Sequence, residues 1–94
     1  MESISLTELV DEQLDLARAA HSGRAAHTVH GGQDHSLRQT VIALAAGHEL
    51  GEHVSPGEDS CDGSTGDYLV IPAERHALLA VDDSAVLLTV LADQ

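Results

Sequence analysis

Two glycine-led stretches form the most informative pattern in this chain. Residues 47–58 read GHELGEHVSPGE, and residues 66–76 read GDYLVIPAERH. Five residues separate Gly47 from His53, whose imidazole can bind a metal, and five separate Gly66 from Pro72, which favours a turn. Each stretch thus begins with a glycine and runs five residues to a residue that can hold a metal or shape a turn.

The first stretch resembles motif one of the cupin superfamily, usually written as glycine, five residues, His-x-His, three or four residues and glutamate. Gly47 and His53 match this pattern, whereas Ser55 stands in the place of the second histidine. Glu58 comes one position early by strict count, and Asp59 fits the count instead. Motif one is therefore degenerate.

The second stretch resembles motif two, usually glycine, five residues, Pro-x-Gly, two residues, histidine, three residues and asparagine. Gly66 and Pro72 match, Glu74 replaces the second glycine, His76 arrives one residue early, and no asparagine follows. The resemblance covers roughly residues 37–91. It implies a small β-barrel of the jelly-roll type in which His53, Glu58 and His76 converge on one pocket.

The residue types of this pocket suit a divalent metal. His53 and Ser55 share one face of a strand because side chains alternate along it. Two neutral imidazoles and a carboxylate that leave positions open form the facial triad of non-haem iron sites. The resemblance thus predicts a site for Zn, Mn, Fe or Ni at His53, Glu58 and His76; the alternative is a metal-free pocket. Further candidates for the pocket wall or the core are Ser55, Tyr68, Ile71 and Leu78.

Length and composition predict one small domain with a thin core. The chain has 94 residues, and Tyr68 is its one aromatic residue. Aromatic side chains normally supply much of the buried area, so alanine, leucine and valine must supply it here. We therefore expect help from a partner subunit, in a homodimer.

The charge and the cysteine count exclude several classes of protein. The formal net charge is −12, with four arginines and no lysine. Binding to nucleic acid or to an anionic membrane needs a basic surface, so neither is expected. Cys61 is the single cysteine, residues 1–3 lack a basic signal start, and the longest apolar run, residues 41–46, is too short to span a bilayer. These features predict a cytoplasmic protein.

A helical arm is predicted over about residues 5–22. Ser5 and Glu8 have the spacing of a capping box, and Ile4 and Leu9 that of a hydrophobic staple. The predicted apolar face, which would pack on its own domain or on a dimer mate, consists of Leu6, Leu9, Val10, Leu14 and Ala17.

The β core is predicted over about residues 24–92. Its expected strands cover residues 24–30, 37–45, 50–55, 68–71, 76–81 and 85–91. Asp82, Asp83 and Ser84 predict a tight hairpin between the last two strands. Only residues 59–65 separate Glu58 from Gly66, where small cupins usually have two more strands. A barrel that lacks these strands exposes two edges, and it would need a partner, a swapped strand or a reorganised sheet.

The expected fold is thus all-β, a small cupin-like barrel that lacks a hairpin and carries one N-terminal helix. Three functions remain open. The first is a binding or sensing module that holds a divalent metal or a small organic ligand. The second is a metal-dependent enzyme of the dioxygenase or isomerase type, as in many cupins. The third is a structural or interaction protein with a vestigial site.

Overall fold

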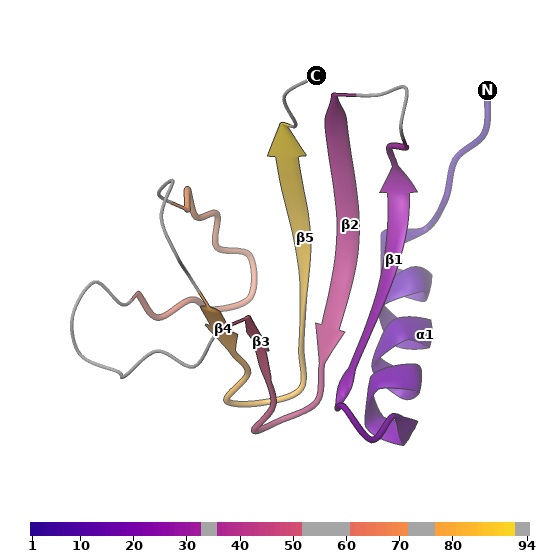
Figure 1. The fold of residues 1–94 in the computed structure, drawn as a ribbon. Coiled ribbons are helices and arrows are strands. Elements are labelled where there is room, and N and C mark those ends of the chain that lie inside the picture. The colour runs from indigo at the N-terminus through magenta and orange to yellow at the C-terminus, as the bar shows by residue number, and fades with distance from the viewer. Residues whose placement is uncertain (33–35, 52–60, 72–76, 92–94) are drawn as a thin grey trace.

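The computed structural model describes residues 1–32, 36–51, 61–71 and 77–91, which form one helix and antiparallel strands (Figure 1). The elements are α1 (Leu6–Ala19), β1 (Arg24–His30), β2 (Leu37–Leu44), β3 (Glu49–Gly51), β4 (Ala77–Leu79) and β5 (Ser84–Leu91). The prediction of a mainly β structure preceded by one helix is confirmed. The described strands form two open sheets and do not close into a barrel.

Helix α1 begins where the sequence predicts. Ser5 is extended (φ −88°, ψ 114°), and its hydroxyl accepts a hydrogen bond from the Glu8 backbone N–H at 3.1 Å. Such an N-cap satisfies a first-turn donor that has no partner inside the helix. The predicted arm extends to residue 22, but α1 ends at Ala19 because Ala20 is already extended (φ −80°, ψ 140°).

One face of α1 packs on the larger sheet (Figure 1). Ala17 is fully buried, and its small side chain allows the helix backbone to lie close to the strands. Gln13 shares this face and is also buried, whereas Leu6 is exposed, contrary to the predicted face. The half-buried residues of the face are Leu9, Val10 and Leu14.

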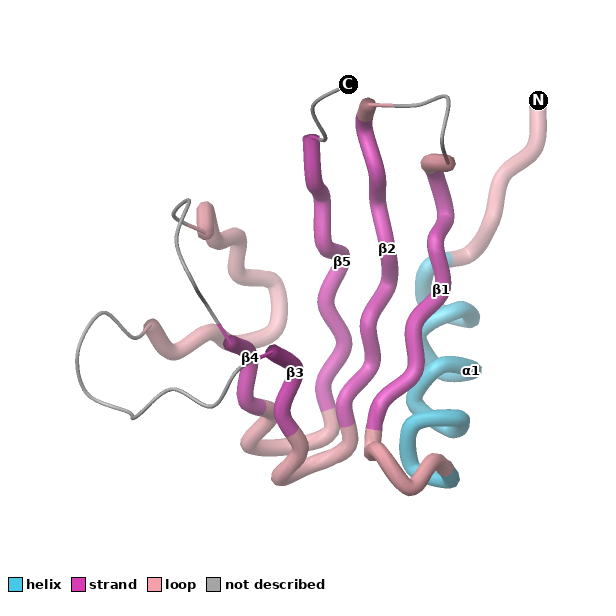
Figure 2. Tube along the Cα trace, in the orientation of Figure 1, coloured by secondary structure: helices cyan, strands magenta, loops and turns pink. Residues whose placement is uncertain are grey.

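The larger sheet has the strand order β1-β2-β5, with both pairings antiparallel (Figure 2). Central β2 places Leu44 opposite Arg24 of β1 and opposite Ser84 of β5. The register of β1 shifts between Thr28 and His30, which marks an irregularity of the β-bulge kind. The register of β5 continues without a shift along the strand.

The chain continues from β2 into β3 and from β4 into β5, so these strands form two sides of one bent ribbon (Figure 1). Gly47 N–H donates to the Ala80 carbonyl at 2.7 Å, and Ala80 N–H donates to the His48 carbonyl at 3.0 Å. These bonds carry the pairing across the bend from β2–β5 to β3–β4.

Two strand predictions are wrong. The hairpin expected at residues 82–84 is not formed, because β4 pairs with β3 and β5 pairs with β2. A short polar segment between two apolar strands has the same appearance whether the chain reverses or bends. The strand expected over residues 68–71 is also not formed, since those residues are irregular and exposed.

The second half of strand β2, residues 41–44, is buried on both faces. Val41 and Ala43 point to the face covered by α1, where His27, the partner of Val41, lies beside residues of the helix. Ile42 and Leu44 point to the opposite face and cluster there with Ala80. The partly buried residues packed on this cluster are Leu50, Leu78, Val86 and Leu88. The folded-over β3–β4 ribbon thus covers part of the second face.

Candidate functional site

The structure describes the two strands that flank the predicted metal ligands in the sequence. His53, Ser55, Glu58 and His76 themselves lie outside the described residues. Gly51, the last residue of β3, lies directly opposite Ala77, the first residue of β4 (Figure 2). Pairing of β3 with β4 therefore brings the last described residue before His53 close to the first described residue after His76.

The candidate wall residues fall into two environments. Tyr68 is 91% exposed and Ile71 is 39% exposed, in the irregular segment 61–71. A turn organises this segment: Ser64 N–H donates to the Asp67 carboxylate at 2.8 Å, and Asp67 N–H donates to the Ser64 carbonyl at 2.9 Å. Leu78 belongs instead to the core, packed against the cluster of Ile42, Leu44 and Ala80.

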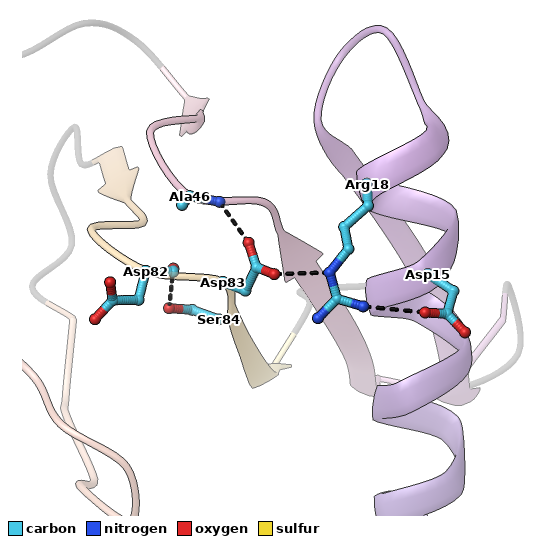
Figure 3. A network of polar contacts seen from close by, with 6 residues as sticks. All are labelled: Asp15, Arg18, Ala46, Asp82, Asp83 and Ser84. Atoms are coloured by element: carbon cyan, nitrogen blue, oxygen red, sulfur yellow. Dashed lines mark hydrogen bonds and ion pairs between the residues drawn. The ribbon is translucent and has the colours of Figure 1, made fainter.

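A polar network that sequence reasoning missed holds the bend of the ribbon against α1 (Figure 3). Arg18 Nε donates to Asp83 Oδ2 at 2.7 Å, and an Arg18 terminal nitrogen donates to Asp15 Oδ1 at 3.0 Å. The other Asp83 oxygen, Oδ1, accepts a hydrogen bond from the Ala46 N–H at 2.8 Å. One carboxylate thereby links α1, the segment after β2 and the segment before β5.

The network shifts both titrations in the directions expected for an ion pair. The hydrogen bond from the Ala46 N–H, followed by the bond from Arg18, lowers the pKa of Asp83 from 3.8. The hydrogen bond to Asp83 raises the pKa of Arg18. One signal in the sequence was available: Arg18 is the basic residue in the last turn of an otherwise acidic helix.

The imidazole of His48 packs against the backbone of Gly23, where a side chain would otherwise lie. Gly23 has a φ of 71°, its N–H donates to the Ala20 carbonyl at 3.0 Å, and its carbonyl accepts from the Ala45 N–H at 2.8 Å. His48 therefore has a packing role.

Within the described part of the chain, no three His, Cys, Asp or Glu side chains cluster as metal ligands.

Two shallow hollows of about 310 Å³ each lie on the described surface. The first adjoins the start of α1, and it is lined by Ser3, Ile4, Ser5, Glu8, Leu9, Glu12 and His27. The second lies between β1 and the ribbon, and it is lined by Ser22, Arg24, Ala25, Ala26, Ile42 and Leu50.

No protein family, curated protein or solved structure matches the chain. In the described residues no helix is long and apolar enough to cross a membrane.

Proposed function

We propose that this chain is a small cupin-like binding module that holds a divalent metal ion between His53 and His76. Glu58 would be the third ligand, and open positions on the ion would accept a small organic ligand. The module would act as a homodimer. The observation that supports this proposal best is the pairing of Gly51 with Ala77, because it limits the separation of the two histidines.

Chain length sets that limit. Paired Cα atoms in an antiparallel ladder lie roughly 5 Å apart. His53 is two residues beyond Gly51, and His76 is one residue before Ala77. At about 3.5 Å per residue, the two Cα atoms can be separated by at most roughly 16 Å. The intervening sequence alone would permit a separation of about 80 Å.

The chemistry of the three side chains fits a divalent ion with open positions. Imidazole nitrogens bind Zn, Fe and Ni, and a carboxylate, which also suits Mn, completes a facial set. The formal net charge of −12 also favours approach of a cation to the protein. A site of this kind suits binding or sensing, because the metal and a small ligand would meet next to the paired ends of β3 and β4.

Isothermal titration of tag-free protein with Zn²⁺ tests the proposal. We expect about one ion per chain for the wild type, and loss of that binding in the variant His53→Ala/His76→Ala. The matched control is His21→Ala/His27→Ala, which removes two imidazoles from described positions outside the β3–β4 pair and should bind as the wild type does. Equal binding by both double variants would overturn the proposal.

A further inference from the structure

One backbone edge of strand β5 pairs with no described strand. β2 is its one hydrogen-bonded neighbour among the described strands, and no other backbone bond of the described loops and turns involves residues 84–91. In a strand paired on one side, alternate N–H and C=O groups point away from the sheet. This row of donors and acceptors is a template for another strand.

The residues of β5 leave that edge unprotected. They read SAVLLTVL, without charge, proline or glycine. Leu87 is 45% exposed, Val90 is 42% exposed and Leu91 is 76% exposed. Proteins that keep an edge free normally place charges, proline or a bulge on it. None of these devices is present along β5.

The opposite edge of the same sheet differs in each respect. β1 carries Arg24, His27 and His30, and its register is broken between Thr28 and His30. Basic or ionisable side chains and a bulge discourage further pairing. Of the two edges, β5 is therefore the one suited to a new strand.

We propose that β5 pairs antiparallel with β5 of a second copy of this chain, forming a six-stranded sheet across a twofold axis. This interface specifies how the homodimer of the proposed function would form, and it does not depend on the metal. A second copy fits because an antiparallel strand is complementary to itself. Because β5 is uncharged, two chains of net charge −12 meet along a neutral edge.

The twofold axis constrains the register. An axis perpendicular to the sheet keeps each face of the sheet on the same side in both copies. Residues that pair across the interface must then both be even-numbered or both be odd-numbered, so that one central residue of β5 lies opposite the same residue of the partner. Centring on Leu87 pairs Val86 with the partner's Leu88, and centring on Leu88 pairs Val86 with the partner's Val90. Either register extends the apolar face of Ile42 and Leu44 across the interface, with both helices on the other face.

The test compares two lysine variants that change the net charge equally. Leu87→Lys places like charges close together at the paired edge, whereas Val81→Lys alters a residue that is 82% exposed and precedes β5. The dimer dissociation constant is measured by sedimentation over a hundredfold concentration range, in EDTA, so that loss of metal binding cannot affect the result. Circular dichroism checks that each variant is folded.

We expect the wild type and Val81→Lys to have the same dimer dissociation constant, and we expect Leu87→Lys to raise that constant about tenfold or more. A wild type that stays monomeric would overturn both the edge and the dimer. A dimer that Leu87→Lys leaves intact would overturn the edge alone.

Cysteine cross-linking gives a second readout that does not disturb the charge. In a Cys61→Ser background, Leu87→Cys or Leu88→Cys should form a disulfide between copies at whichever position is central. His27→Cys on β1 is the control and should stay reduced. Failure of both β5 cysteines, or equal linkage through His27→Cys, would contradict the proposal.

Discussion

Replacing Gly23 with alanine tests how closely the helix, the strand and the bend fit together. Gly23 joins α1 to β1 at a φ of 71°, in the left-handed region, where a residue with a Cβ costs about 1–2 kcal/mol. A Cβ would also overlap the ring of His48, and moving this exposed side chain out of its rotamer costs about 0.5–1.5 kcal/mol. The free energy of unfolding should therefore fall by about 1.5–3.5 kcal/mol.

That loss is a large fraction of the expected stability. A chain of 94 residues at typical values has roughly 5–14 kcal/mol in total. Two further variants separate the contributions. His48→Ala alone should change little, because His48 is exposed. In the His48→Ala background, Gly23→Ala should cost only the backbone part, about 1–2 kcal/mol. The difference measures the overlap with the ring.

Urea unfolding followed by far-UV circular dichroism is the assay, since the chain has no tryptophan. Gly63→Ala is the matched control, because a Cβ at Gly63 would meet no atom within 4 Å and no positive φ is present there. It should change stability by no more than about 0.5 kcal/mol. Equal costs of Gly23→Ala with and without His48 would refute the proposed packing, as would a cost equal to that of Gly63→Ala.

Two further predictions concern the core and the network. Leu44→Ala should lower the free energy of unfolding by about 2–5 kcal/mol, because Leu44 is 1% exposed in the cluster of Ile42 and Ala80; Leu69→Ala, on the exposed segment 61–71, is the control and should be nearly neutral in the same urea assay. Asp83→Asn should destabilise the protein at neutral pH, and this difference from the wild type should shrink as the pH falls below the ordinary value of 3.8. The sign follows because the pKa of Asp83 is lower in the folded than in the unfolded protein. The ionised carboxylate therefore stabilises the fold at pH values above the unfolded pKa, and this stabilisation is lost as Asp83 becomes protonated in the folded protein. Urea midpoints measured from neutral to acidic pH check it, and a difference that stays constant with pH would contradict it.

The sequence predicted those elements well that depend on interactions between residues close together in the chain. The side chain of Ser5 caps α1 as its spacing from Glu8 indicates. The apolar run around Val41 and Ile42 became β2, and residues 24–30 became β1 at the predicted bounds. These outcomes depend on neighbours a few residues apart, which a sequence displays directly.

The errors concern pairings between distant residues. Asp83 has the sequence context of a turn, yet it binds Arg18 across 65 positions and the Ala46 N–H across 37, so the chain bends there instead of reversing. Tyr68–Ile71 is apolar enough for a strand but pairs with no described strand. Nothing in the local sequence states which strand is available as a partner, and that choice decided both cases. His53, Glu58 and His76 remain predictions.

Native mass spectrometry of tag-free protein, with Zn²⁺ supplied and then with the variant His53→Ala/His76→Ala, tests the central claim most directly. The proposal predicts a dimer that carries about one ion per chain, and a dimer of the variant that carries none. It would be contradicted by a wild type that stays free of metal, or by a variant that keeps the same number of ions.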